Sequence, residues 1–251
     1  MSGRVSFIRR YGGYYTIVAA VVLGMKWYYS GAGCGELRWI LAPTAWWVEV
    51  LSGNSFVYEP QIGYINHPLR FIIAPSCSGV QFLIIVFAVL AGAFIHRMKT
   101  GKQRVCWMAG CVVVSFLFTV LINGLRIAVS IYAPNLVFQS EWMEDLVTPS
   151  QLHTMIGATV YFGSLMAVYC AADCVVGRSE GAESDNTGWL VPVMIYGLIV
   201  LGLPLLNGAL SGNGERYSGY AALVIVVCTL VLCLFWGVKR LWKIRRVWKI
   251  H

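Results

Sequence analysis

Three short segments place reactive side chains inside otherwise apolar stretches of the sequence. The first holds the thiol of Cys77 between Ser76 and Ser78, the second the guanidinium of Arg126, and the third the imidazole of His153. An ionisable group at the centre of a membrane span costs about 2.5–3.5 kcal/mol, so such a group is a candidate functional residue. Together the three supply a nucleophile, a base that accepts the thiol proton, and a donor that stabilises an oxyanion. The residue types therefore predict cysteine-based nucleophilic chemistry.

Polar neighbours at helical spacing strengthen this interpretation. Gln81 shares a helix face with Cys77, and Asn123 shares one with Arg126. Each residue alone has a plainer explanation, because a single membrane cysteine usually packs as a small apolar residue and a single arginine can snorkel or pair with an acid. The convergence of three helices on one layer favours a site, with Ser78, Gln81 and Asn123 as supporting residues.

Other candidate groups have weaker patterns around them. His67 is a rival base, because it lies ten residues before Cys77, but it is followed by Pro68. Lys26 and Asp173 lie near the ends of their apolar stretches, where each can reach water. For the remaining paired cysteines, apolar packing is favoured over a thiolate metal site: Cys106 with Cys111, and Cys170 with Cys174. We therefore expect no metal and no cofactor.

The elements that carry these residues are predicted to be membrane helices. The chain has 251 residues, of which 58% are hydrophobic and 12% charged, and a soluble domain has about twice that charged share. A helix needs about 20 apolar residues to span a bilayer. Six stretches qualify: Tyr14–Ser30, Phe71–Ile95, Val105–Tyr132, Leu152–Val176, Trp189–Leu210 and Tyr220–Val238. A seventh stretch, Leu37–Leu51, has the length and the spacing of a helix in the headgroup layer. The predicted fold is an all-α polytopic bundle with an interfacial outer helix.

Basic residues in the short loops predict the orientation, because Lys and Arg collect on the cytoplasmic side. The formal net charge is +8. Because the basic residues lie beside apolar segments, we interpret them as setting the membrane topology and binding anionic lipid headgroups, rather than binding nucleic acid. Alternation places thirteen of the basic residues on one side: Arg4, Arg9, Arg10, Arg97, Lys99, Lys102, Arg104, Lys239, Arg240, Lys243, Arg245, Arg246 and Lys249. The opposite loops hold acidic residues, among them Glu36, Glu49, Glu59, Glu141, Glu144 and Asp145. Both termini are thus predicted to be cytoplasmic, and the protein to lie in the inner (plasma) membrane.

The predicted organisation is a four-helix core over residues 1–176, a polar linker over 177–188 and a two-helix hairpin with a basic tail over 189–251. The linker is rich in Gly and Ser and separates the two apolar parts. Helix direction places Cys77, Arg126 and His153 in one outer layer. At about 1.5 Å per residue, Cys77 and Arg126 each lie about 9 Å below the outer end of a helix.

At this point the motifs resemble those of a known family. Pro-Ser-Cys-Ser-Gly at 75–79, Asn-Gly-Leu-Arg-Ile at 123–127 and His-Thr-Met-Ile-Gly at 153–157 are similar to the three motifs of exosortases and archaeosortases, which are multipass membrane transpeptidases. The stretch Tyr-Tyr-Ser-Gly-Ala-Gly at 28–33 and the modest length resemble the exosortase K branch. Many relatives have about eight spans, which leaves the role of the last hairpin open.

The resemblance implies Cys77 as the nucleophile, His153 as the general acid and base, and Arg126 as the electrostatic or oxyanion-stabilising partner. It implies membrane-anchored protein substrates whose C-terminal signal has a short motif, a spanning helix and a basic tail, and an acceptor that receives the acyl group. Two alternatives from other classes stay open. A transporter or lipid-binding scaffold would use Arg126 in a substrate path, although we find no repeat or matched broken helices. A sulfur-based redox carrier is disfavoured, because no paired cysteine faces the outer site.

Overall fold

The computed structural model of the chain describes residues 2–139, 147–180, 188–206 and 214–248. The helices are α1 (Ser2–Gly31), α2 (Arg38–Ser52), α3 (Val80–Phe94), α4 (Gly101–Val137), α6 (Pro149–Glu180), α7 (Leu190–Gly197), α8 (Leu203–Leu206) and α10 (Gly214–Trp248). Short 3-10 turns η1 (Pro75–Cys77) and η2 (Ile95–Arg97) flank α3, and a π-helical turn η3 (Leu198–Gly202) joins α7 to α8. The chain is helical, as predicted, apart from one small sheet.

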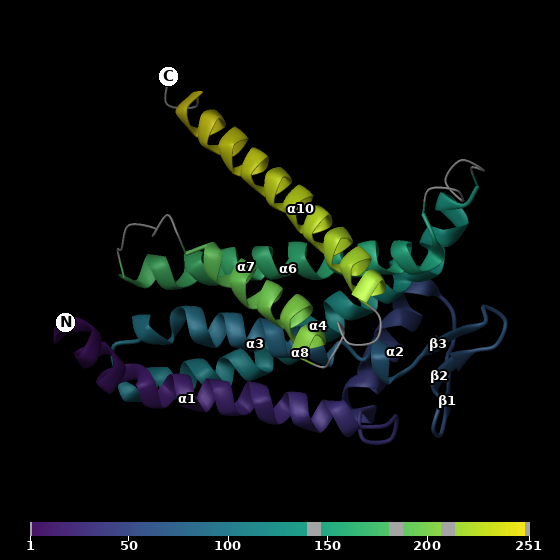
Figure 1. Cartoon of the computed structure of the whole chain (residues 1–251), viewed down its shortest axis with the longest axis horizontal. Helices are drawn as coiled ribbons and strands as arrows, with labels where there is room; N and C mark the ends of the chain where they lie inside the picture. The colour runs from purple at the N-terminus through teal and green to yellow at the C-terminus, as the bar shows by residue number, and fades with distance from the viewer. Residues whose placement is uncertain (1, 140–146, 181–187, 207–213, 249–251) are drawn as a thin grey trace.

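Helix α3 lies at the centre of the molecule (Figure 1) and packs against α1, α4, α6 and α7, while α10 packs against α6. Twelve of its fifteen residues are buried. By contrast, α4 exposes an apolar side: Val112, Val113, Leu117, Leu121 and Leu125 are all between 44% and 58% exposed. A helix that is apolar on every side belongs in a core, and exposed apolar stripes on its neighbours suit contact with lipid.

Four helical segments are long and apolar enough to cross a membrane: Pro75–Arg97, Gly101–Val137, Pro149–Gly177 and Tyr217–Gly237. The apolar segment Leu190–Gly202 is shorter. These four indicate a membrane protein. Helix α1 has 30 residues but is not among the four, because its sequence is less apolar. The predicted stretch Trp189–Leu210 contains a π-helical turn, Leu198–Gly202, between α7 and α8, and its residues 207–210 lie outside the described residues.

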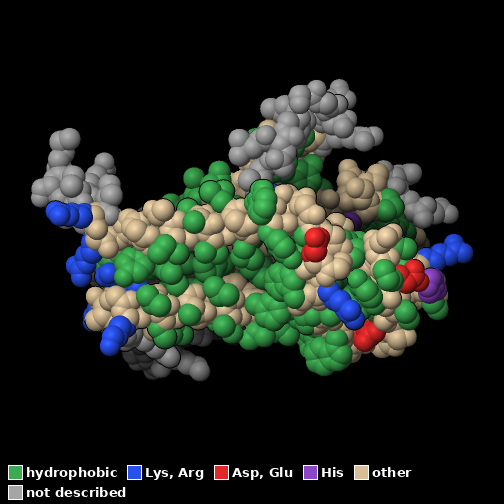
Figure 2. Space-filling model, turned by 90° about the horizontal axis from the view of Figure 1, so that it is seen from below, with side chains coloured by type: hydrophobic (Ala, Val, Ile, Leu, Met, Phe, Trp, Pro, Cys, Tyr) green, Lys and Arg blue, Asp and Glu red, His purple; other side chains and the backbone are tan. Residues whose placement is uncertain are grey.

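Figure 2 shows how charge is distributed over one face of the molecule: Lys and Arg gather at one end, a hydrophobic belt follows, and the acidic and His side chains lie toward the other end with further basic residues. The start of α1 and the turn between α3 and α4 share one end. Tyr15 bonds to the carbonyl of Gly92, and the guanidinium of Arg104 lies 4.7 Å from the ring of Tyr11. The exposed Lys99 belongs to the same turn.

A three-stranded antiparallel sheet at the opposite end was not predicted. It comprises β1 (Val57–Glu59), β2 (Gly63–Asn66) and β3 (Phe71–Ile73), in the order β1-β2-β3. The backbone N–H of Phe56 donates to Glu49 Oε1 (2.6 Å), which links the sheet to α2. The predicted amphipathic helix over Leu37–Leu51 is confirmed as α2; it packs on α4 and buries Ile40, Leu41, Thr44, Ala45 and Val48.

The prediction of one helix over Phe71–Ile95 is wrong at its start. Residues 71–73 pair with β2 and the helix proper begins at Val80. Pro75 disfavours helical angles at the preceding residue, and Ala74 is extended, with ψ 173°. Cys77 therefore lies in a turn before the helix, not two turns inside it, and the predicted depth of about 9 Å does not apply. The predicted acidic residues Glu141, Glu144 and Asp145, and linker residues 181–187, lie outside the described residues.

Candidate active site

Cys77 ends the short turn η1, which the local sequence forces between strand β3 and helix α3. The N–H of Cys77 donates to the carbonyl of Ala74 (2.8 Å), and the N–H of Ser78 donates to that of Pro75 (3.1 Å). Gly79 then takes a left-handed conformation, with φ +76°, and the chain enters α3. The side chain of Cys77 is half-buried. The turn presents the cysteine directly before the N-terminus of a buried helix, where the helix dipole favours negative charge.

Asn123 of α4 holds this turn in place. Its side chain is fully buried, and its Nδ2 donates to the carbonyl oxygen of Cys77 (2.7 Å). A Cβ at residue 79 would lie 2.9 Å from the Asn123 amide, so only glycine allows this approach. The positive φ of residue 79 also favours glycine at this position. The predicted supporting residue Asn123 thus contacts the backbone of the predicted nucleophile.

Arg126 and His153 form a direct pair between α4 and α6. Helix α6 starts with a reciprocal cap in which the N–H of Gln151 donates to Thr148 Oγ1 (3.3 Å) and the N–H of Thr148 to Gln151 Oε1 (2.9 Å). The cap sets His153 in the first turns of α6. Arg126 Nη2 lies 2.6 Å from His153 Nε2. Gly157, one turn later, leaves the space that Arg126 occupies, since a Cβ there would lie 3.1 Å from Arg126 Nε.

The pair fixes which ring nitrogen of His153 carries the proton. A guanidinium has only donors, so Nε2 of His153 must accept from Arg126, and this assigns the ring proton to Nδ1. The lone pair that would take a thiol proton is therefore engaged with Arg126. In contrast, Nε of Arg126 is buried and has no hydrogen-bond partner among the residues that the structure describes. An unsatisfied buried donor is costly, and an oxygen atom of a bound ligand would satisfy it.

Tyr161, two turns beyond His153 on α6, completes a polar cluster. Its hydroxyl donates to Asn123 Oδ1 (2.6 Å) and accepts from Arg126 Nη1 (3.5 Å). Its ring stacks on Phe82, with centroids 4.3 Å apart and planes 9° apart. The sequence interpretation missed Tyr161, although it follows His153 and Gly157 at steps of four along one helix face.

A pocket of about 210 Å³ opens beside these groups. Ser76, Gly79 and Gln81 line it from the cysteine side, and Arg126, His153 and Tyr161 line it from α4 and α6. The remaining wall includes residues that sequence reasoning did not single out: Tyr29 of α1, Tyr196 of α7, Val200 of η3, and Tyr220 and Val224 of α10. The C-terminal hairpin, whose role was left open, thus contributes directly to the pocket.

The structure brings together Arg126, His153 and the Cys77 turn, but it does not join the reacting atoms. In the part of the chain that is described, no hydrogen bond links the Cys77 sulfur to Arg126 or His153. Of the supporting residues, Gln81 lines the pocket, while Ser78 is fully buried and its hydroxyl lies near the N–H of Val80 (3.5 Å).

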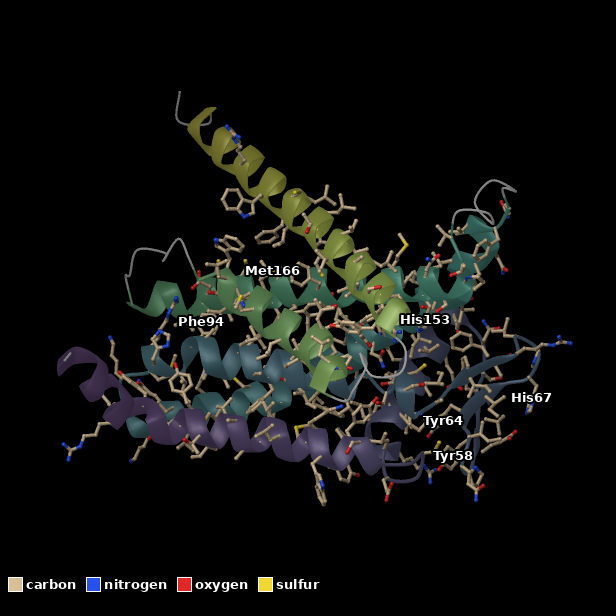
Figure 3. All side chains as sticks on the ribbon, viewed as in Figure 1. Tyr58, Tyr64, His67, Phe94, His153 and Met166 are labelled. Atoms are coloured by element: carbon tan, nitrogen blue, oxygen red, sulfur yellow. The ribbon has the colours of Figure 1, made fainter. Side chains whose placement is uncertain are left out.

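The rival base lies elsewhere. Figure 3 labels His67 at the tip of the sheet and His153 in the body of the bundle. His67 Nε2 contacts Glu59 Oε1 at 3.0 Å, and the histidine side chain is 70% exposed. At the other end, Asp173 forms an ion pair with Arg97 (2.7 Å), which gives this acid a structural partner.

Comparison of the chain with protein-family models, curated proteins and solved structures found no match. The resemblance to exosortases and archaeosortases therefore rests on the three motifs of this chain.

Proposed function

We propose that the protein is a cysteine-dependent transpeptidase or peptidase of the exosortase type in the inner membrane. It cleaves a C-terminal sorting signal of membrane-anchored proteins at the outer face. The observation that carries the proposal is the contact of Arg126 with His153 at a pocket that Ser76 and Gly79, on either side of Cys77 in the sequence, also line. In the topology that we propose, with six spans and both termini in the cytoplasm, this pocket lies near the outer surface; the basic residues of the short loops support that orientation.

The proposed reaction begins when the Cys77 sulfur adds to the carbonyl carbon of the scissile peptide bond. Arg126 leaves His153 and donates to the oxygen that becomes negative, which frees Nε2 of His153 to take the thiol proton. The imidazolium then protonates the departing amine, and an acyl thioester remains on Cys77. An acceptor amine or water attacks the thioester and returns the thiol. The Nε–H of Arg126 supports this role, because this donor has no acceptor among the described residues and could donate to the oxygen of a bound substrate.

The test is mass analysis of the C-terminus of a candidate anchored protein from cells with and without this protein. We expect a shortened C-terminus only when the protein is present. His153→Ala should lower the processed fraction by about 100-fold, since general base catalysis contributes about 10²–10⁴. His67→Ala is the matched control and should process normally, because its ring contacts Glu59 on the sheet, away from the pocket. Loss of processing with His67→Ala and not with His153→Ala would reassign the base.

The orientation is tested by labelling introduced cysteines with an impermeant maleimide added from outside the cell. Ser55, between α2 and β1, and Lys102, in the first turn of α4, are both exposed. We expect Ser55→Cys to gain label over the parent chain and Lys102→Cys to gain it only after the membrane is opened. The reverse pattern would put the pocket on the cytoplasmic side and contradict the proposal.

A transporter that uses Arg126 in a substrate path is the second candidate, favoured by one observation: the helix that lines the pocket at Val200 contains the π-helical turn η3, a distortion that is frequent at functional sites. A transporter does not need a thiol at residue 77. Transport that survives Cys77→Ala would favour this candidate.

A further inference from the structure

The hydroxyl of Tyr161 lies between two groups whose hydrogen-bonding roles cannot change. Arg126 can only donate, and the carbonyl oxygen of Cys77 can only accept. Between them stand the Tyr161 hydroxyl and the Asn123 amide, joined by contacts of 3.5, 2.6 and 2.7 Å. The only orientation that satisfies every contact runs from Arg126 to Tyr161, then to Asn123 Oδ1, and from Asn123 Nδ2 to Cys77.

This chain fixes the orientation of the Asn123 amide. If the amide were flipped, its oxygen would face the carbonyl oxygen of Cys77, and its NH2 group would replace the oxygen that accepts from the Tyr161 hydroxyl. Because Asn123 is fully buried, no bulk water can compensate for these mismatches. Hydrogen bonds in a chain that starts at a cation also polarise one another. The Cys77 carbonyl and the Tyr161 hydroxyl therefore hold the Asn123 amide from its two ends, and the hydroxyl is the contact that ties it to α6.

The ring of Tyr161 is held independently of its hydroxyl. It stacks on Phe82 in the first turn of α3, and the Arg126 guanidinium carbon lies 5.2 Å from its centroid. The residue thus contacts the helix that follows the cysteine turn and both polar residues of the α4 motif. Its hydroxyl can be removed without removing the ring.

We propose that Tyr161 is a positioning residue: through Asn123 it sets the Cys77 turn relative to Arg126, without touching the reacting atoms. The expected effect on processing kinetics rests on the proposed function, whereas the expected effect on the order of the Cys77 turn does not. The turn's own hydrogen bonds, from the N–H groups of Cys77 and Ser78, report on its order whether or not the protein is an enzyme.

The test compares Tyr161→Phe with Tyr169→Phe in the full-length protein in lipid nanodiscs. Both changes remove one hydroxyl from α6 and keep the ring, and Tyr169 lies two turns away with its ring 5.3 Å from that of Phe94. Hydrogen exchange of the peptide 74–80 should accelerate about tenfold with Tyr161→Phe and stay unchanged with Tyr169→Phe. The kcat for processing should fall about tenfold at nearly constant KM.

Combination with Asn123→Ala separates positioning from general structural support. Because both changes break one chain, Tyr161→Phe should add little exchange or kinetic loss in the Asn123→Ala background. Unchanged exchange in Tyr161→Phe, or additive effects in the double variant, would overturn the inference. If hydrogen exchange shows non-additive effects of the two substitutions but the parent protein processes no substrate, the proposed function is rejected and the positioning role of Tyr161 is supported.

Discussion

Cys77→Ala is expected to reduce processing of the anchored substrate by at least about 10³-fold, because it removes the atom that forms the thioester. The turn around residue 77 is held by backbone hydrogen bonds and by Asn123, which bonds to the carbonyl and not to the thiol. The change should therefore leave folding intact. Mass analysis of the substrate's C-terminus measures the processed fraction, and thermal unfolding in detergent checks the fold.

The matched control is Cys228→Ala on α10, which removes another half-buried thiol from a helix that lines the pocket. Processing should be unchanged in this variant. Activity that persists in Cys77→Ala, or that disappears only in Cys228→Ala, would contradict a Cys77 thioester.

Arg126→Lys is expected to lower processing by about 100-fold although it keeps the positive charge. Arg126 reaches His153 with Nη2 and Tyr161 with Nη1, and its Nε remains free for a third partner. An ammonium group cannot direct planar donors along these three lines at once. Loss of one donor to an oxyanion typically costs about 10²–10³ in rate. Single-turnover kinetics with a cleavable anchored substrate would measure the loss in the chemical step.

Arg97→Lys provides the control, because Arg97 undergoes the same chemical change at the opposite end, where it pairs with Asp173. The pair is partly buried, with side chains 20% and 27% exposed, but lysine keeps the positive charge and neither residue lines the pocket, so processing per folded molecule should stay near the parent value. Equal activity of Arg126→Lys and the parent protein would show that charge alone suffices and would remove the proposed donor role.

The helical segments and the placing of Arg126 and His153 in one layer could be anticipated from the sequence for physical reasons, whereas their direct hydrogen bond was not predicted. Long apolar runs have one stable form in lipid, and residues on successive antiparallel helices at similar depth meet in one layer. The amphipathic spacing of α2 likewise gave its position within one residue at each end. These features depend on local composition and on alternation of direction.

The surroundings of Cys77 could not be anticipated, because they depend on strand pairing and on one packing contact. Phe71–Ile73 is apolar in either a strand or a helix, and only its partner β2 decides between them. The consequence of Pro75 for Ala74 was recognisable, yet the apolar residues on both sides of the Pro75–Gly79 segment suggested one helix across the break. The link from Tyr161 to Asn123 joins residues 38 positions apart and leaves no spacing pattern within one helix.

The burial of α3 has a consequence for what holds the bundle together. When an apolar helix moves from contact with lipid tails to contact with other helices, no apolar surface is removed from water, so the hydrophobic effect does not drive the association. The association of α3 with its neighbours must then rest on dispersion contacts and on the few polar bonds between helices, such as Trp107 Nε1 to the carbonyl of Leu90 (3.1 Å). Along this helix, side-chain shape should therefore determine stability more than hydrophobicity does. Exchanging one apolar residue for another of different volume should destabilise the bundle more than exchanging it for a more hydrophobic residue of equal volume.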